Sequence, residues 1–306
     1  MSQILLEQIT SIQEYDIFHF HGDNGFIRCE YANRSVLTLH GIASSTSSFA
    51  KKFVTTLPSR IERNNAKLAR KVFSISSEAA IFFERYSKYP IQVIKQSIDT
   101  DFYKPTSLAH RHYYRKIFGL SDTDIVGIIV GTDPVRKGLH IAIRAVEMLV
   151  ESNIVLFAIG FPKIVTKNKK IRNFGKVDEA TKLRCLQIAD FFIFPSQKEG
   201  FPLSVLEAAS VGKPLIVSKN SNVSELGNFV TYFDEIDSFN PLDYKIGIEK
   251  FIQDYVKSTH DHTLNRKDFL DQYSLTSMVR KYYDVYSNEI MVDDWNNFSS
   301  KQSSQS

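Results

Sequence analysis

The sequence predicts an α/β protein built from two Rossmann-type parallel-sheet domains that face a cleft. Short apolar runs alternate with longer segments of helical periodicity. The stretch 102–124 carries no strand pattern and separates two groups of strands, and no repeat of 20–50 residues runs through the chain. We therefore expect a first domain over residues 1–110, a second over 111–290 and a flexible polar tail over 291–306.

The apolar runs predict four strands in the first domain and five in the second. They lie at 16–20, 35–39, 71–75, 91–94, 125–130, 155–159, 191–194, 214–217 and, more weakly, 229–233. Helical spacing of apolar residues predicts helices at 139–150, 179–188, 203–210 and 277–290. Ligands of open parallel sheets bind beyond the carboxyl ends of the strands, so the segments directly after the strands are the candidate sites.

Composition excludes several classes of protein. The 306 residues are 43% hydrophobic and 24% charged, which is typical of a globular chain, and a net charge of +4 is too small for a committed nucleic-acid binder. Cys29 and Cys185 stand alone, so neither a disulfide framework nor a zinc cluster is expected. No secretory signal and no apolar run of about 20 residues is found. A cytoplasmic location is expected.

The most informative stretch is 191–218, in which an apolar strand is followed by a short loop and a helix that begins near Pro202. Glu199 in the loop and Glu207 in the helix place two carboxylates near the helix N-terminus. Free backbone N–H groups around residues 201–204 form an anion site there. A phosphate on these amides and sugar hydroxyls on the carboxylates would fit one ligand, whereas a capped helix with two solvated glutamates is the alternative.

This arrangement resembles the carboxyl-terminal half of the retaining GT-B glycosyltransferases of family 4, also called glycosyl transferases group 1. The family hallmark is two glutamates with seven residues between them, as E-G-F-[GP]-L-x-x-x-E-A, and residues 199–208 read E-G-F-P-L-S-V-L-E-A. The flanking stretches 175–196 and 212–226 also resemble the family. The resemblance implies a GT-B-like fold and a hexosyl transferase of class EC 2.4. It would move a sugar from a nucleotide-diphosphate sugar to an acceptor hydroxyl, with retention, in glycan or glycolipid biosynthesis.

A second candidate site follows the strand at 125–130. Gly131 ends the strand, Arg136 and Lys137 lie in the loop, and Gly138 opens an amphipathic helix. A lysine at such a turn can meet a diphosphate as a point charge. Relatives that this stretch resembles use the lysine of their K-G pair, here Lys137, and an arginine at the position of Thr132. We expect Arg136 to supply that second charge, with a solvated basic turn as the alternative.

The resemblance implies roles for these residues. Glu199 would hold and orient the donor sugar, and Glu207 would hold the ribose hydroxyls. The leaving phosphate oxygen would take the acceptor proton, so no protein nucleophile, metal or cofactor beyond the donor substrate is expected. The implied donor-binding set is Gly131, Thr132, Arg136, Lys137, Gly200, Phe201, Pro202, Leu203, Ser204 and Glu207.

Three histidines mark the first domain. His40 directly follows a predicted strand and matches the family histidine that helps to hold the donor sugar, so it joins Glu199 as a predicted catalytic residue. His19 and His21 alternate along the preceding strand, and we expect at most one of them to face the cleft. A metal site at these histidines is disfavoured because no acidic partner stands at ligand spacing.

The first domain is expected to be shortened, because relatives begin with a glycine-rich loop and further β-α units before the equivalent of Asp16. An uncovered sheet edge would result, which a second copy of the chain or a partner chain would cover. Segment 49–71 carries seven basic residues and one acidic residue. It favours a solvated face, with peripheral binding at the inner face of the membrane as the alternative.

Two other functions stay open from the sequence. The substituted Thr132 and the shortened domain favour a non-catalytic or partner-dependent subunit that binds a nucleotide sugar. A GT-B-like sugar-nucleotide epimerase is the weaker alternative, because its acid/base residues are not found. The intact glutamate pair favours catalysis, with a nucleotide sugar and a saccharide or lipid-linked saccharide as partners and no nucleic acid.

Overall fold

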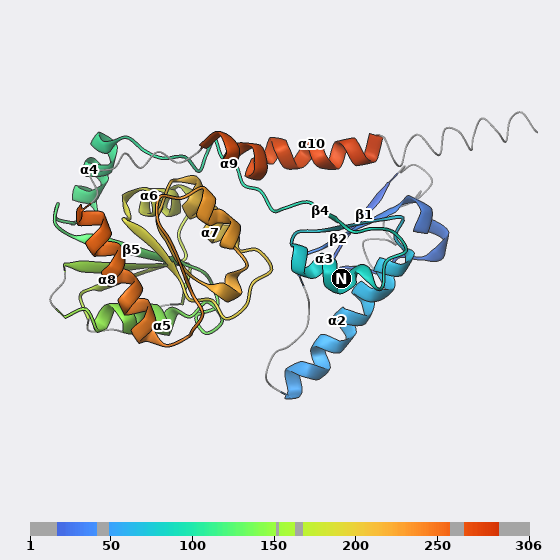
Figure 1. The fold of residues 1–306 in the computed structure, drawn as a ribbon, viewed down its shortest axis with the longest axis horizontal. Helices are drawn as coiled ribbons and strands as arrows, with labels where there is room; N and C mark the ends of the chain where they lie inside the picture. Colours follow the sequence, from blue (N-terminus) through green and yellow to red (C-terminus); the bar gives the residue numbers. More distant parts are fainter. Residues whose placement is uncertain (1–16, 42–48, 151–152, 163–167, 258–265, 288–306) are drawn as a thin grey trace, which may run out of the picture. The chain divides into compact units, whose positions relative to one another are not determined.

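The structure is a computed structural model that describes residues 17–41, 49–150, 153–162, 168–257 and 266–287 (Figure 1). It divides into two compact units: Met1–Gln96 together with Thr276–Ser306, and Ser97–Leu275. The tail predicted over 291–306 lies outside the described residues. Each unit contains one parallel sheet, which confirms the predicted two-domain α/β class.

This division differs from the expected boundaries at residues 110 and 290. The last described helix, α10 (Leu275–Val285), packs on the first unit, where Met278, Tyr282 and Val285 join the core cluster that contains Val36 and Phe73. The chain after Gln96 is tied to the second unit, because Ile98 N–H donates to the Tyr273 carbonyl. Long-range packing therefore decides the boundaries.

The first unit is a four-stranded parallel sheet in the order β1-β2-β3-β4, with strands Phe18–His21, Ser35–Leu39, Lys71–Ser74 and Gln92–Val93. The 3-10 helix η2 (Cys29–Arg34) leads into β2. Helices α2 (Phe49–Leu68) and α3 (Ser77–Glu84) contribute Ala66 and Phe83 to the core with Leu37, while α10 packs with Val36 on the opposite side. Among the described residues, β1 pairs only with β2; the expectation of a covering partner stays a prediction.

The second unit is a six-stranded parallel sheet in the order β10-β9-β8-β5-β6-β7. The strands are β5 (Ile125–Val130), β6 (Ile154–Ile159), β7 (Ile171–Gly175), β8 (Phe191–Phe194), β9 (Leu215–Ser218) and β10 (Phe233–Ile236). The chain runs outward from β5 through β6 to β7 and then returns to β8 and runs the other way. The topological switch point therefore lies between β5 and β8, and the loops after these two strands meet there.

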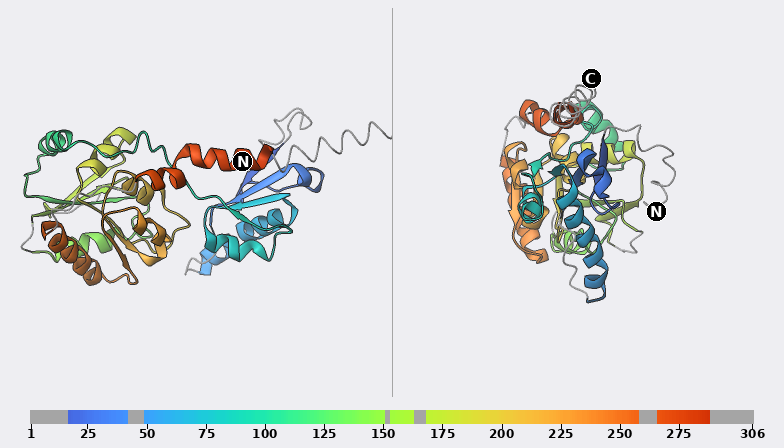
Figure 2. Two further views of the ribbon diagram at one scale, coloured as in Figure 1. Left: turned by 45° about the horizontal axis from the view of Figure 1, so that its top comes forward. Right: turned by 90° about the vertical axis from the view of Figure 1, so that its right-hand side faces the viewer.

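Helices cover both faces of this sheet (Figures 1 and 2). Residues of α5 (Leu139–Glu147) and α8 (Pro241–Lys257) form one core cluster with the sheet, including Ala142, Ile129 and Ile248. The other helices are α4 (Leu108–Ile117), α6 (Glu179–Ile188), α7 (Leu203–Ser210) and α9 (Arg266–Tyr273), and the short 3-10 helices are η3 (Lys219–Ser221) and η4 (Ser224–Asn228). Most predicted elements are confirmed. The strand expected at 229–233 lies instead at Phe233–Ile236, and β7, α3, α4, α8 and α9 were not predicted.

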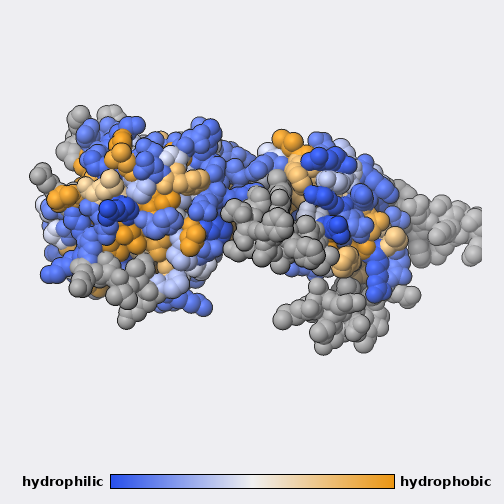
Figure 3. Space-filling view, turned by 90° about the horizontal axis from the view of Figure 1, so that it is seen from below, coloured by the Kyte–Doolittle hydropathy of each residue, from blue (hydrophilic) through white to orange (hydrophobic). Residues whose placement is uncertain are grey.

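The face of each unit drawn in Figure 3 mixes hydrophilic side chains with apolar patches. Among the described residues, we find no helix whose length and apolar character would allow it to cross a bilayer.

Candidate functional site

The loops after β5 and β8 are joined at the switch point of the second unit. Gly138 begins α5 with a φ of 69°, and a Cβ at this position would lie 2.1 Å from the carbonyl oxygen of Pro195. Two hydrogen bonds reach the Arg136 carbonyl from the other loop, from the Gln197 N–H at 2.8 Å and the Ser196 hydroxyl at 3.1 Å. Glycine at position 138 thus permits the close approach that brings the two predicted motifs together.

Glu199 is the centre of a charged cluster built by these two loops. Its Oε1 accepts hydrogen bonds from Arg136 Nη1 at 2.6 Å, Lys137 Nζ at 2.7 Å and Ser196 Oγ at 2.6 Å. The loop is held from the other side, because Glu199 N–H donates to the Asn220 carbonyl and Asn222 Nδ2 donates to the Glu199 carbonyl. Arg136 and Lys137, which are predicted to bind a diphosphate, therefore bind in this structure the carboxylate of Glu199, which is predicted to bind a sugar.

Lys137 lies inside this cluster, only 8% exposed, with Nζ 4.7 Å from the ring centroid of Phe194. Burial lowers the pKa of Lys137, and the hydrogen bond and charge of Glu199 oppose that shift. Gly131 makes room for the side chain, since a Cβ there would lie 2.8 Å from Lys137 Cγ. A buried ammonium of this kind is poorly hydrated and interacts strongly with an anion.

The remaining residues of the β5 loop are more exposed. The Asp133 carboxylate accepts hydrogen bonds from the Val135 and Arg136 N–H groups at 3.1 and 3.0 Å, which holds the turn. The Arg136 side chain is 44% exposed although it pairs with Glu199. Thr132 is exposed, and no hydrogen bond connects it to the cluster within the described residues. The structure therefore groups Arg136 and Lys137 but leaves Thr132 outside.

Glu207 forms a separate polar site on α7, and its side chain is largely buried. Its Oε1 accepts a hydrogen bond from Lys182 Nζ at 2.9 Å, whereas Oε2 is buried without a hydrogen-bond partner in the described part of the chain. Burial raises the pKa of Glu207, and the neighbouring Lys182 and, to a smaller extent, Tyr103 oppose that shift. Lys182 was missed by the sequence analysis; its position three residues after Glu179, at the start of a predicted helix, was the available signal.

The start of α7 carries the remaining predicted donor residues. Phe201 is 7% exposed and stacks on Tyr273 with ring centroids 6.0 Å apart, so its side chain is part of the core. Pro202 is the N-cap residue of α7. In the described structure we find no hydrogen-bond acceptor for the N–H groups of Gly200, Phe201, Leu203 and Ser204. These amides have the arrangement that suits an anion at a helix N-terminus.

The three histidines lie in the first unit and line one pocket of about 540 Å³ at the carboxyl ends of β1–β4. His21 Nδ1 lies 2.9 Å from His40 Nε2, and His19 is hydrogen-bonded to Thr38 at 2.7 Å and to Tyr286 at 2.6 Å. His19 and His21 both line this pocket, because residues two apart on a strand share a face. The expectation that at most one of them faces the cleft stays a prediction.

The charge state of these imidazoles follows from their burial. Burial lowers the pKa of His19 to about 4, with smaller contributions from the neighbouring histidines, and it also lowers the pKa values of His21 and His40. All three are therefore uncharged near neutral pH. We find no group of acidic, cysteine and histidine side chains suited to a metal ion among the described residues.

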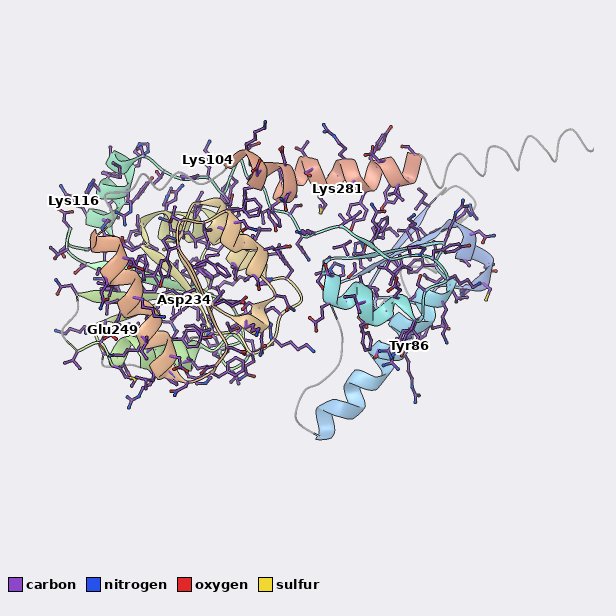
Figure 4. All side chains as sticks on the ribbon, viewed as in Figure 1. Tyr86, Lys104, Lys116, Asp234, Glu249 and Lys281 are labelled. Carbon is purple, nitrogen blue, oxygen red and sulfur yellow. The ribbon has the colours of Figure 1, made fainter. Side chains whose placement is uncertain are left out.

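The basic segment forms a hollow of about 480 Å³ on the outside of α2, where Arg60, Arg63 and Lys67 share one helix face. Tyr86, labelled in Figure 4, also lines it, and the Arg63 guanidinium lies 5.1 Å from the Tyr86 ring centroid. Three cations of the basic segment therefore gather at one hollow, together with apolar Ile61. Membrane binding stays a prediction.

Known proteins resemble this chain in fold and in the sequence that carries the switch-point loops and the glutamate pair. Residues 111–261 match the family model described as Glycosyl transferases group 1, and this range contains both charged sites. Anabaena HepE in complex with UDP and glucose has a similar structure, with a TM-score of 0.68 and 18% identity over 83% of this chain and 71% of that chain. Sucrose-phosphate synthase from Thermosynechococcus elongatus gives a TM-score of 0.72 at 14% identity, over 89% and 73%. The fold is GT-B, and these findings support a GT-B glycosyltransferase.

Individual relatives are similar over different lengths. The chain is 27% identical to the UDP-Gal:alpha-D-GlcNAc-diphosphoundecaprenol alpha-1,3-galactosyltransferase of Escherichia coli, over 93% of this chain and 78% of the relative. It is 61% identical over 33 residues, 11% of this chain and 9% of the relative, to the Campylobacter jejuni N,N'-diacetylbacillosaminyl-diphospho-undecaprenol alpha-1,3-N-acetylgalactosaminyltransferase.

Proposed function

We propose that this protein transfers a hexosyl group from a nucleoside-diphosphate sugar to a hydroxyl of a saccharide linked to a polyprenyl diphosphate, with retention of configuration. The observation that carries the proposal is the cluster in which Arg136 and Lys137 converge on one anionic oxygen of Glu199 at the switch point. The two relatives named above are described as transferases for diphosphoundecaprenol-linked acceptors, which supports the acceptor class.

The donor diphosphate would take the place of Glu199 at the two cations. Lys137 is buried, and the turn between β5 and α5 holds its charge in place, so it would stabilise the negative charge on the leaving phosphate once the donor has replaced Glu199. The unpaired amides at the start of α7 would add donors to the same phosphate oxygens. The released Glu199 carboxylate would then accept hydrogen bonds from hydroxyls of the transferred sugar and orient its anomeric carbon.

The chemical step would break the bond between the anomeric carbon and the phosphate oxygen and form the bond to the acceptor oxygen on the same face. The leaving phosphate oxygen would take the acceptor proton. Protein cations supply the charge that the leaving group needs, so we expect no metal requirement. His40, whose pKa is lowered by partial desolvation and by the neighbouring His21, would donate or accept a hydrogen bond at the sugar.

A test starts from the purified chain and a panel of UDP-, ADP- and GDP-sugars. A donor at 100 times its Kd should stabilise the protein by about 2.7 kcal/mol, which a thermal shift detects. The binding donor is then incubated with N-acetylglucosaminyl diphosphate carrying a polyprenyl or short alkyl chain. Formation of a disaccharide with the anomeric configuration of the donor, read by NMR, is the expected result.

The same assay distinguishes the proposed function from a non-catalytic subunit that only binds a nucleotide sugar. Donor binding without transfer or donor hydrolysis would support that alternative. Absence of any nucleotide-sugar binding would overturn the proposed function itself.

A further inference from the structure

The Glu207 carboxylate is held asymmetrically. One oxygen, Oε1, is paired with Lys182 Nζ at 2.9 Å, and the other, Oε2, is buried with no hydrogen-bond partner among the described residues. The whole residue is only 8% exposed. An unsatisfied oxygen on a buried carboxylate is costly, so its persistence indicates an acceptor kept for a ligand.

Lys182 is itself fixed from several sides. Its Nζ also pairs with Glu179 Oε2 at 2.9 Å, and it lies 5.3 Å from the ring centroid of Tyr103. The Tyr103 hydroxyl donates to the same Glu179 oxygen. The Asp178 side chain caps α6 by accepting from Thr181 N–H at 2.7 Å, which fixes the turn that carries Lys182. The lysine is thus an immobilised cation.

The protonation of the pair agrees with this geometry. Burial acts to lower the pKa of Lys182, but its hydrogen bonds and charge interactions with Glu207 and Glu179 raise it above its usual value. The side chain therefore stays an ammonium, which offsets part of the cost of burying the Glu207 carboxylate. Lys182 pairs with Glu207 and Glu179, whereas the Glu199 side chain pairs with Arg136, Lys137 and Ser196, so the two charged groups have different partners.

We propose that Lys182 is a positioning residue that makes the nucleotide site selective for ribose, by holding Glu207 so that Oε2 alone receives the ribose hydroxyls. This inference rests on the proposed function, because it assumes that the ligand of the site is a nucleoside diphosphate. A carboxylate oxygen accepts one or two hydroxyl donors, and a deoxyribose that offers none leaves it unpaired in a dry environment. Lys182 touches the carboxylate rather than the nucleotide.

The test is a comparison of UDP with 2′,3′-dideoxy-UDP by isothermal titration of the full chain. Lys182→Met removes the charge and keeps most of the side-chain volume. It should weaken UDP binding by about 10- to 100-fold, the loss expected for a hydrogen bond to a charged group, and change 2′,3′-dideoxy-UDP binding by less than about twofold. The ratio of the UDP affinity to the 2′,3′-dideoxy-UDP affinity should therefore fall by the same 10- to 100-fold.

Two further variants separate positioning from folding. Lys182→Arg keeps the charge and should retain part of the selectivity. Arg184→Met removes an exposed cation from the same helix and should leave both affinities as in the wild type. Melting temperatures of all variants, measured without ligand, monitor the fold.

Two outcomes would overturn the inference. In one, Lys182→Met binds both nucleotides with the wild-type ratio, so that Lys182 has no part in ribose recognition. In the other, both affinities fall equally, which assigns the lysine to the phosphates or to the fold. A wild-type chain that binds none of UDP, ADP and GDP would instead overturn the proposed function, so the two failures are distinguishable.

Discussion

Lys137 Nζ lies 2.7 Å from Glu199 Oε1, although the two residues belong to loops that follow different strands. The lysine is predicted to hold a diphosphate and the glutamate a sugar, yet in this structure each compensates the charge of the other. The diphosphate of a donor must therefore replace the Glu199 carboxylate at Lys137 and Arg136. The expected effects of substitutions at Glu199 and Lys137 follow from this replacement.

Replacing Glu199 should separate nucleotide binding from transfer. Glu199→Ala removes the internal anion that competes for Lys137 and Arg136, so UDP affinity should be unchanged or a few-fold tighter. Turnover should fall by about 10- to 100-fold or more, because the sugar loses a charged hydrogen-bond partner. Titration calorimetry and initial rates measure the two effects, and a marked loss of UDP affinity would mean that the assigned role is wrong.

Replacing Lys137 tests the source of charge at the leaving group. Lys137→Ala should slow transfer by about 100-fold or more, since a buried, preorganised cation is lost from the transition state. Chelation with EDTA should leave the wild-type rate unchanged. An enzyme silenced by EDTA and restored by magnesium or manganese would contradict this prediction, and Arg144→Ala, on the exposed side of α5, is the matched control.

The contact between the two loops is tested at Gly138. Gly138→Ala would place a Cβ 2.1 Å from the Pro195 carbonyl oxygen, at a φ of 69°, and should both destabilise the protein and weaken UDP binding. Gly212→Ala is the control, because its φ is 76° but no atom lies within 4 Å of the added Cβ. It should show only the backbone cost of about 1–2 kcal/mol. Equal effects in urea unfolding would show that the loop contact is unimportant.

The histidine pocket predicts a loss of stability in acid. Burial lowers the pKa of His19 from 6.5 to about 4, so the unfolded chain binds a proton that the folded chain does not between these values. The free energy of unfolding is therefore not reduced by His19 above pH 6.5. It decreases as the pH falls from 6.5 towards 4, by at most about 3 kcal/mol.

NMR titration of the His19 ring and urea unfolding at pH 7.5 and 5 test this prediction. His19→Gln should reduce the difference in unfolding free energy between the two pH values. An imidazole that titrates near pH 6.5 in the folded protein would contradict the buried, uncharged state.

Local sequence determined much of the fold and the candidate site. Apolar runs located the strands that carry the site, because a strand buried on both faces needs apolar residues throughout, and β5 and β8 are buried along nearly their whole length. The motif at 199–208 located both glutamates, since their spacing and the helix start at Pro202 are local properties. The strand β7 escaped prediction because it is an edge strand, largely half-buried, and its sequence IRNFG has no apolar alternation.

Tertiary structure decided which of these residues meet. The return of α10 to the first unit depends on contacts such as Tyr282 with Thr38, and the pairing of Glu207 with Lys182 joins α7 to α6. The meeting of Lys137 with Glu199 follows from the adjacency of β5 and β8, which the order of strands along the chain does not reveal. Periodicity and motifs depend on residues close together in the sequence, so they predict helices, strands and local loops. Strand order and helix packing bring charges from distant parts of the sequence within hydrogen-bonding distance.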